Sequence, residues 1–350
     1  MRIVDVGRAF PRHFYEQETL LAALRAHWGQ RHRNPARLER LHRNVLVGGR
    51  HLALPLQEYP QLTDFGAAND AWIRVGLEVG EAAVRDAMAR AKVSWDRVGA
   101  IFAVSVTGVA TPSLDARLMN RIPELPRRLK RVPIFGLGCV AGAAGLARAA
   151  DYVKAYPDQV ALLLSVELCS LTLQRDDLSI PNLISTGLFG DGAACAVVAG
   201  ANVPAEGPQV LATRSIFWDD TERVMGWDIS GQGFKIVLDK SVPEVVDAHL
   251  RGEVDAFLAD EGVTLADIGS FVCHPGGPKV IDAMAHALDA PPGALDLTRR
   301  SLAEVGNLSS ASVLMVLGDT LAERRPAPGT LGLLIAMGPA FGAELVLLRW

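Results

Sequence analysis

Short apolar runs alternate with longer amphipathic stretches along the whole chain. Apolar runs that end in Gly, Pro or charged residues predict buried β-strands, and apolar positions that recur with helical spacing predict α-helices. The predicted strands are residues 1–7, Val98–Val106, Val132–Phe135, Gln159–Val166, Ala193–Val198, Ile268–Cys273, Thr330–Ala336 and Leu345–Leu348. The predicted helices are Asn69–Ala91, Leu114–Arg121, Val140–Tyr156, Pro243–Asp260, Pro278–Leu288 and Ser310–Arg324. This alternation is typical of an α/β fold with buried sheets.

The order of the elements indicates an internal duplication. The clearest break in composition is the stretch 200–208, which is rich in Gly, Ala and Pro and lies between two series of strands and helices. We therefore expect two α/β halves, residues 1–205 and 206–350, with a site at their junction. The repeat is visible in the order of elements and not in residue identity.

Composition restricts the class of protein. The chain has 350 residues, of which 49% are hydrophobic and 21% charged, so it can bury a large core. A formal charge of −4 gives no reason to expect a nucleic-acid partner. No Cys-x-x-Cys pair, signal peptide or membrane-spanning run is evident, which favours a cytoplasmic enzyme without disulfides, structural zinc or a membrane span. The Arg- and His-rich stretch 31–50 is the only dense basic segment, and a solvated helix face is its default interpretation.

The first candidate for chemistry is Cys139, which lies in the small-residue run 136–145. Glycine and alanine allow a substrate to approach the backbone closely, and a helix is predicted to begin just after the sulfur. The positive end of a helix dipole favours the thiolate, which is the nucleophilic form of cysteine. A small buried cysteine that fills a tight contact is the alternative.

Two further polar side chains follow core elements. His274 ends a strand-like run and precedes Pro275, and Asn307 lies in a small-residue turn before the helix that begins at Ser310. A nucleophilic thiol, an imidazole base and a carboxamide donor are the groups that acyl transfer needs. Each residue taken alone has a structural alternative, such as a hydrogen-bonded histidine or a helix cap.

These residues stand in motifs that resemble the type III polyketide synthases, the chalcone-synthase-like branch of the thiolase superfamily. The similar motifs occur in the family's order: Gly138-Cys139, Leu188-Phe189-Gly190-Asp191-Gly192, Gly233-Phe234, His274-Pro275-Gly276-Gly277-Pro278, Gly306-Asn307-Leu308-Ser309-Ser310 and Gly338-Pro339. The resemblance implies a thiolase-like duplicated fold of five αβαβα layers with mixed sheets. It also implies a homodimer, CoA thioesters as substrates, and no metal or tightly bound cofactor.

The resemblance assigns the three polar residues to one reaction. Cys139 would accept a starter acyl group from its CoA thioester, paired as thiolate with the imidazolium of His274. His274 and Asn307 would then hydrogen-bond the thioester oxygen of malonyl-CoA and stabilise the enolate that forms when carbon dioxide leaves. The extended poly-β-keto chain would finally be cyclised.

Other matching positions would shape the cavity. Phe189 and Phe234 match gatekeeping aromatics, although an ordinary core role is their default without the resemblance. Gly338 and Pro339 match the cyclisation loop, in which Ala340 replaces a usual glycine. Four small residues match cavity positions: Cys169, Thr172 and Ser309 on the wall, and Thr111 in a segment that reaches the partner subunit. In bacterial relatives small residues at such positions open a tunnel, so the resemblance favours a fatty acyl starter and an alkylpyrone or alkylresorcinol product.

The resemblance also gives the basic stretch a role. Arg37 and Arg40 match cationic positions that meet CoA phosphates, and a third such position falls on Asn44 with Arg43 beside it.

Three alternatives stay open at this point. A β-ketoacyl-carrier-protein synthase III-like enzyme of fatty-acid initiation uses the same three residue types but resembles this chain less after the histidine. A papain-like cysteine hydrolase has a similar order and spacing, but Cys139 lacks the aromatic residue that follows the protease nucleophile. A non-catalytic acyl-CoA-binding protein is the third alternative.

Overall fold

The computed structural model describes residues 1–28 and 35–350, and the statements below concern these residues. A nine-stranded mixed sheet has the order β11-β12-β13-β8-β1-β7-β6-β4-β5. In that order the strands are Ile268–Cys273, Leu331–Gly338, Gly342–Arg349, Gln209–Phe217, Arg2–Ala9, Asp191–Ala199, Val160–Leu168, Val98–Val104 and Lys130–Ile134.

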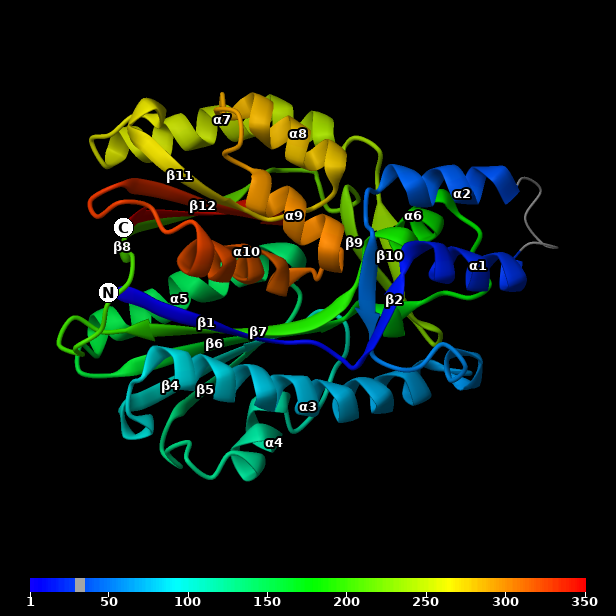
Figure 1. Ribbon diagram of the computed structural model, residues 1–350, viewed down its shortest axis with the longest axis horizontal. Coiled ribbons are helices and arrows are strands. Elements are labelled where there is room, and N and C mark those ends of the chain that lie inside the picture. Colours follow the sequence, from blue (N-terminus) through cyan, green and yellow to red (C-terminus); the bar gives the residue numbers. More distant parts are fainter. Residues whose placement is uncertain (29–34) are drawn as a thin grey trace.

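The sheet consists of two parts that are joined at one narrow point. Strands β1 and β8 pair only at Arg2 and Gln209, whereas β1 pairs with β7 and β8 pairs with β13 along most of their lengths. Each part contains parallel neighbours (β11 with β12, β4 with β5 and β6) together with antiparallel ones. The two parts therefore form separate layers that face each other, as Figure 1 shows.

Helices lie between the two sheet layers and on both outer sides (Figure 1). Helices α5 (Ala141–Ala155) and α10 (Ser310–Glu323) occupy the middle. Helices α3 (Phe65–Ala91) and α4 (Leu114–Arg121) cover one outer face, and α7 (Val242–Asp260) and α8 (Pro278–Ala287) cover the other. The expected five-layered αβαβα arrangement with mixed sheets is confirmed.

The composition of the middle helices explains how they fit between two sheets. Residues Ser310 to Leu321 of α10 are all buried, and α5 is built largely from Ala and Gly. At Gly142 an added Cβ would lie 2.7 Å from Val313 Cγ1 and closer still to the Ser310 carbonyl oxygen. The two helices can therefore approach each other only because α5 has no side chain at this position.

A lateral extension, on the right in Figure 1, lies beside the layers. It contains β2 (His13–Glu16), α1 (Gln17–Trp28), α2 (Pro35–Asn44), β3 (Gly49–Leu52), α6 (Ile180–Leu188), β9 (Met225–Ser230) and β10 (Gly233–Leu238). A small core of Leu21, Trp28, Leu38 and Leu183 joins α1, α2 and α6.

The remaining elements are helices. Helix α9 (Asp296–Val305) precedes α10, and the one-turn helices are η1 (Tyr59–Gln61), η2 (Trp95–Arg97), η3 (Gly138–Val140), η4 (Cys169–Thr172) and η5 (Leu265–Asp267).

All predicted strands and helices are confirmed, with shifts of a few residues at some ends. The list of predicted elements did not include the short strands β2 and β3, the strands β8, β9 and β10, or the helices α1, α6 and α9. Helix α2 lies in the basic stretch 31–50, for which a solvated helix face was the default interpretation. In β8 and β9 most residues are half-buried or exposed, so these strands lack a continuous apolar run. Within the described residues no helix combines the length and the apolar character that crossing a membrane requires. The division of the chain at residues 205 and 206 stays a prediction.

Candidate active site

Cys139 lies in the turn between β5 and α5. The one-turn helix η3 presents the thiol, and α5 begins two residues later at Ala141, as predicted. Gly138 has a φ of +56°, and a Cβ there would lie 2.5 Å from Pro339 Cδ. Glycine is therefore required before the cysteine, because both the backbone angle and the neighbouring loop exclude a side chain.

The Gly338-Pro339 loop contacts this turn from the other side. A Cβ on Gly338 would lie 2.6 Å from the Val140 amide nitrogen. The loop therefore packs directly against the Cys139 turn, where its backbone bounds the site. Ala340, which replaces the glycine expected from the resemblance, has a φ of 65°.

His274 follows β11 and is almost fully buried, with 3% of its surface exposed. Its amide nitrogen donates to the Ile335 carbonyl oxygen of β12 at 2.9 Å, which fixes the backbone. Neither ring nitrogen has a hydrogen-bond partner among the described residues. Burial lowers the pKa of the His274 imidazole to about 3, so the ring is neutral near neutral pH.

Asn307 lies in the turn between α9 and α10 and is held by its backbone. Its amide nitrogen donates to Leu188 O at 2.9 Å, and its carbonyl oxygen accepts from Gly190 N at 3.0 Å. Its side chain donates from Nδ2 to Gly276 O at 3.2 Å and accepts on Oδ1 from Ser309 N at 2.8 Å. The carboxamide therefore joins the His274 loop to the start of α10.

A series of contacts brings the three predicted residues together. Cys139 Sγ donates to Ser309 Oγ at 3.6 Å, and Ser309 is bonded in turn to Asn307. Asn307 reaches Gly276, whose amide donates to the His274 carbonyl oxygen at 3.0 Å. Thiol, carboxamide and imidazole thus come from three distant parts of the sequence, and these contacts link the three loops that carry them.

Burial controls ionisation at this site. Burial raises the pKa of the Cys139 thiol to about 12, with the nearby Glu167 carboxylate adding to the effect and the hydrogen bond to Ser309 opposing it. Since burial also keeps His274 neutral, it opposes the thiolate–imidazolium pair that the resemblance implies. That ion pair stays a prediction.

Glu167 is a buried carboxylate that the sequence analysis did not identify. It lies in β6, whose residues are all buried, and it accepts from Val106 N at 3.1 Å and from Thr107 Oγ1 at 2.9 Å. Ser310, the first residue of α10, also donates to it. The available signal was an acidic residue inside an otherwise apolar run.

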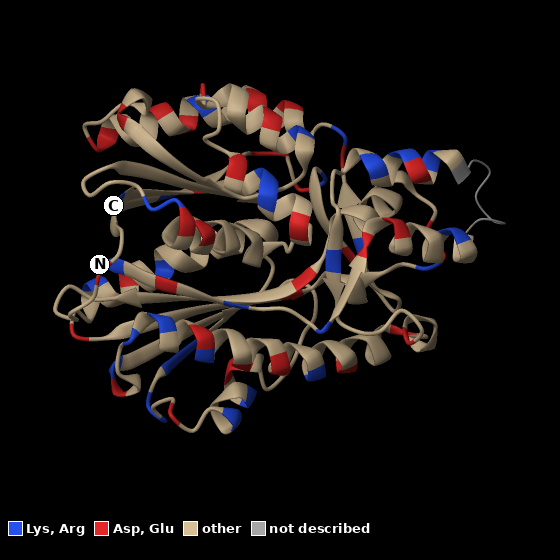
Figure 2. Cartoon of the chain, in the orientation of Figure 1, with Lys and Arg blue, Asp and Glu red and all other residues tan. Residues whose placement is uncertain are grey.

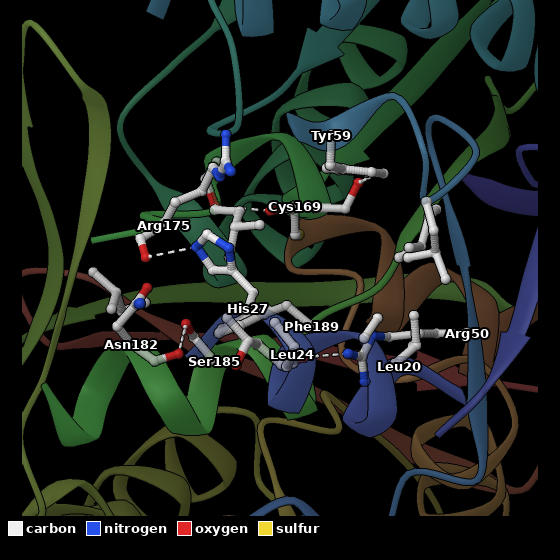
Figure 3. A pocket seen from close by; sticks show the side chains of 18 of the residues that line it. Leu20, Leu24, His27, Arg50, Tyr59, Cys169, Arg175, Asn182, Ser185 and Phe189 are labelled. Carbon is white, nitrogen blue, oxygen red and sulfur yellow. Dashed lines mark hydrogen bonds between the residues drawn. The ribbon is translucent and has the colours of Figure 1, made fainter. Parts of the chain in front are cut away.

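A cavity of about 170 Å³ opens beside Cys169 (Figure 3), and we call it the α1 cavity. Its lining includes Cys169, Thr172 and Phe189, as the resemblance implies. Apolar side chains from α1, among them Leu20 and Leu24, form another part of the wall. The remaining lining residues are Ala23, His27, Arg50, Leu52, Leu56, Tyr59, Pro60, Ser170, Leu173, Arg175, Asn182, Ser185, Thr186, Trp227 and Ile236.

Other expected pocket residues lie elsewhere. Phe234 is buried in β10 against Phe65 at 5.2 Å between ring centroids and against Trp227 at 6.0 Å. Thr111 is exposed and lines a different cavity, together with Phe135. Ser309 contacts Cys139 but does not line the α1 cavity.

Comparison with known proteins identifies the family. Residues 1–203 match the N-terminal domain of the chalcone and stilbene synthases, and residues 209–350 match their C-terminal domain. The chain belongs to this family. Its members are type III polyketide synthases, acyltransferases that catalyse decarboxylative condensation of malonyl-CoA. The sequence motifs had indicated this assignment.

Individual relatives match over nearly the whole chain. The 1,3,6,8-tetrahydroxynaphthalene synthase of Streptomyces peucetius is 50% identical over 99% of this chain and 93% of its own length. A putative chalcone synthase of Bacillus subtilis is 37% identical over 99% and 98%. The crystal structure of the 1,3,6,8-tetrahydroxynaphthalene synthase of Streptomyces coelicolor superimposes with a TM-score of 0.95 at 31% identity, and the match covers 100% of this chain and 99% of that one.

The basic residues expected to meet CoA lie on helix α2 of this synthase. Arg37 and Arg40 are exposed, and Figure 2 shows the blue segments along α2. Arg43 is also exposed but pairs with Glu39 at 3.1 Å, one turn earlier on the same helix. Residues 31–34 of the basic stretch lie outside the described residues.

The described residues contain no group of three or more His, Cys, Asp or Glu side chains placed to hold a metal ion. The four cysteines, Cys139, Cys169, Cys195 and Cys273, are free and buried.

Proposed function

We propose that Cys139, His274 and Asn307 are the catalytic residues of this type III polyketide synthase. The observation that carries the proposal is the contact series from Cys139 through Ser309 and Asn307 to the His274 loop, in which all four residues are buried. His274 supports it independently, because a buried imidazole whose two nitrogens have no partner among the described residues leaves hydrogen-bonding capacity for a substrate.

In the loading step, His274 carries one proton. It accepts the Cys139 proton as the sulfur attacks the thioester carbonyl of the starter, and it returns that proton to the sulfur of the departing CoA. The new bond joins Cys139 Sγ to the acyl carbon, and the bond that breaks joins that carbon to CoA. The lowered pKa of His274 keeps the ring neutral and able to accept a proton at rest, and the same burial opposes the gain of that proton during the transfer.

In the extension step, His274 and Asn307 act as neutral donors. When malonyl-CoA loses carbon dioxide, the electron pair of the broken bond moves onto the thioester oxygen as an enolate. One N–H of neutral His274 and the second N–H of Asn307 Nδ2, which donates its other hydrogen to Gly276, are available to this oxygen. The enolate carbon then attacks the acyl group on Cys139 and releases the thiolate.

For the product, we favour an unsubstituted aromatic polyketide of the tetrahydroxynaphthalene type, with malonyl-CoA as both starter and extender. The relative from Streptomyces peucetius, named for that product, supports this choice through its 50% identity across the chain. A tetrahydroxynaphthalene has no alkyl or aryl substituent, so a starter with a side chain does not fit its skeleton.

A second candidate is the long-chain acyl starter predicted from the sequence, with an alkylpyrone or alkylresorcinol as product. The α1 cavity favours it, because small residues such as Cys169 and Thr172 border a cavity with apolar walls from α1. A Cys169→Phe variant would narrow the cavity at its wall. Under this second proposal, activity with long starters falls far more than activity with malonyl-CoA alone.

Mass spectrometry of products decides between these candidates. The purified enzyme is given labelled malonyl-CoA alone or with acetyl, medium-chain, long-chain or aromatic acyl-CoA, beside a Cys139→Ala control. Products from malonyl-CoA alone that vanish in the control support the favoured function. Products that require a long-chain starter support the second candidate, and polyketides that persist in Cys139→Ala refute the role of the thiol.

The remaining features of the proposal concern substrates and assembly. The enzyme uses CoA thioesters without a tightly bound cofactor, and exposed Arg37 and Arg40 on α2 contact the CoA phosphates, with Arg43 nearby. Phe189 and Phe234 separate the CoA entrance from the cavity, and Gly338 and Pro339 shape the cyclisation wall.

Two α/β halves, 1–205 and 206–350, form each subunit. The enzyme is a homodimer in which the Thr111 segment contributes to the partner's cavity.

A further inference from the structure

Three polar side chains from separate elements form a row at the wall of the α1 cavity. Tyr59 of η1 lines the cavity, and its hydroxyl is hydrogen-bonded to Ser170 Oγ of η4. Ser170 Oγ in turn donates to the carboxylate of Asp191, the first residue of β7. Figure 3 labels Tyr59 beside Cys169 in the cavity. One end of the row therefore lines the cavity, and the other end is a carboxylate that is fully buried.

The remaining contacts of the row fix its geometry. Asp191 accepts from Ala53 N at 2.6 Å and from Ser170 N at 2.8 Å, so its carboxylate cannot rotate away. The Tyr59 oxygen accepts from Leu54 N at 3.4 Å. Ser170 has only one hydroxyl hydrogen, so the direction of the whole row depends on the protonation of Asp191. An ionised Asp191 receives the Ser170 hydrogen, and Ser170 then receives that of Tyr59.

When the hydrogen bonds of the row run in the opposite direction, the Tyr59 hydroxyl becomes available as a donor to the cavity. A protonated Asp191 donates to Ser170, which then donates to the Tyr59 oxygen. That oxygen already accepts from Leu54, so the Tyr59 hydrogen is free to turn toward a ligand. The other titratable groups that interact electrostatically with Asp191 are Arg50, Cys169 and Tyr59 itself. Burial raises the pKa of Asp191 to about 7, while its hydrogen bonds with Ser170 and Ala53 and, less strongly, the charge of Arg50 oppose the shift. Both protonation states are therefore accessible near neutral pH.

We propose that Tyr59, Ser170 and Asp191 form a proton relay that serves ring closure of the poly-β-keto chain through carbon–carbon bonds. This inference rests on the proposed function, since it needs a polyketide chain in the α1 cavity. Cys169 lines that cavity and lies within electrostatic range of Cys139, which is not itself one of the lining residues. The relay is separate from the residues proposed for loading and extension.

An aldol closure moves one proton from a methylene carbon to a carbonyl oxygen, and the relay holds that proton in between. Tyr59 takes the methylene proton while its own passes to Ser170 and that of Ser170 passes to Asp191. The carbon electron pair forms the new bond to the carbonyl carbon, and the π electrons of that carbonyl move to its oxygen. The row then reverses, and Tyr59 delivers the proton to this oxygen. No external acid, base or oxidant is needed for this step, and free tyrosinate is never formed.

The role of each residue follows from its place in the row. Tyr59 is the member that exchanges a proton with the chain. Ser170 also lines the cavity but passes the proton on, and Asp191 acts through both. Because the relay must begin with ionised Asp191, the share of carbon–carbon ring products falls as pH is lowered through the pKa of this carboxyl group.

Tyr59→Phe is the decisive variant, because it removes one oxygen atom and keeps the ring that lines the cavity. Tyr15→Phe is the matched control, since Tyr15 also accepts a backbone amide, Leu56 N at 3.2 Å, but does not line the α1 cavity. Wild type, both variants and Ser170→Ala are given labelled malonyl-CoA between about pH 6 and 8. Mass spectrometry measures the ratio of carbon–carbon ring products to lactone products, and CoA release measures total condensation.

The relay predicts that this ratio falls at least about tenfold in Tyr59→Phe and in Ser170→Ala, while total condensation falls much less. The ratio also loses its pH dependence in both variants, and Tyr15→Phe behaves like wild type. An unchanged ratio in Tyr59→Phe overturns the relay, as does a loss of condensation with no change in ratio. A wild-type enzyme that forms only lactones overturns it too.

The same experiment separates this inference from the proposed product. A wild-type enzyme that makes another carbocyclic product refutes the tetrahydroxynaphthalene proposal, but the ratio still reports on the relay.

Discussion

The contact between α5 and α10 gives a quantitative test of the fold around the nucleophile. In Gly142→Ala the new Cβ would lie 2.7 Å from Val313 Cγ1, whereas ordinary contacts begin near 3.4 Å. The Ser310 carbonyl oxygen is closer still, and backbone cannot move aside like the end of a side chain. The two helices must therefore separate, and overpacking of this kind costs about 1–3 kcal/mol.

Gly252→Ala provides the opposite case within the same chain. Gly252 lies in the middle of α7 and is exposed, and apart from its chain neighbours and the backbone of its own helix no atom of residues 1–28 or 35–350 lies within 4 Å of an added Cβ. Replacing an exposed helical glycine by alanine stabilises a protein by about 0.5–1 kcal/mol through backbone entropy and helix propensity. We therefore expect the two variants to differ by roughly 3 kcal/mol, with wild type between them.

Urea denaturation at one fixed protein concentration measures this difference as a change in the free energy of unfolding. The fixed concentration matters because dimerisation would couple stability to concentration. Equal stability of Gly142→Ala and wild type, within about 0.5 kcal/mol, would refute the reasoning, because the helices would then have room for the methyl group. Gly142 follows Cys139 by three residues, so the destabilised variant should also lose synthase activity.

Two further outcomes follow from single residues. Ala340 has a φ of 65°, which glycine adopts more easily than alanine, so Ala340→Gly should raise the free energy of unfolding in urea by about 0.5 kcal/mol. Ala283→Gly within α8 should lower it by about 1 kcal/mol. A change of the same sign in both variants would contradict this prediction. Burial lowers the pKa of His42 to about 4 in the folded protein, so between about pH 6 and 4 the unfolded chain binds a proton at His42 that the folded protein does not. The contribution of His42 to stability therefore falls as pH drops through this range. The unfolding free energy of wild type minus that of His42→Gln should therefore fall by about 1.4 kcal/mol per pH unit in this range, and a pH-independent difference would show that His42 titrates normally.

The sequence predicted those elements whose burial is continuous and whose ends carry strong breakers. Strand Ile268–Cys273 and helix Leu114–Arg121 have the predicted bounds, because an apolar run or an amphipathic period stops there at a Pro, Ser or charged residue. Strand β8 was missed because Thr213, Arg214 and Ser215 interrupt its apolar pattern. Their partners in β13 stabilise the strand instead, and such pairing between distant segments is not visible locally.

The candidate site shows the same limit. The residue types of Cys139, His274 and Asn307 could be selected from motifs, but the contact through Ser309 and Gly276 depends on how three loops meet. Tyr59 and Ser170 carried no signal of their own in the sequence. They come from one-turn helices in different parts of the chain, and only their common approach to Asp191 makes them notable.

The layered fold also bears on the ionisation of Cys139. Helix α5 begins two residues after Cys139, α10 begins one residue after Ser309, and α8 begins four residues after His274. Each functional loop therefore leads directly into the positive end of a helix dipole, which favours negative charge on a neighbouring atom. The positive end of a helix dipole lowers the pKa of a neighbouring thiol, whereas burial raises the pKa of the Cys139 thiol. The arrangement thus suits a thiol that stays protonated at rest and sites where negative charge develops only during the reaction, on the sulfur and on the enolate oxygen.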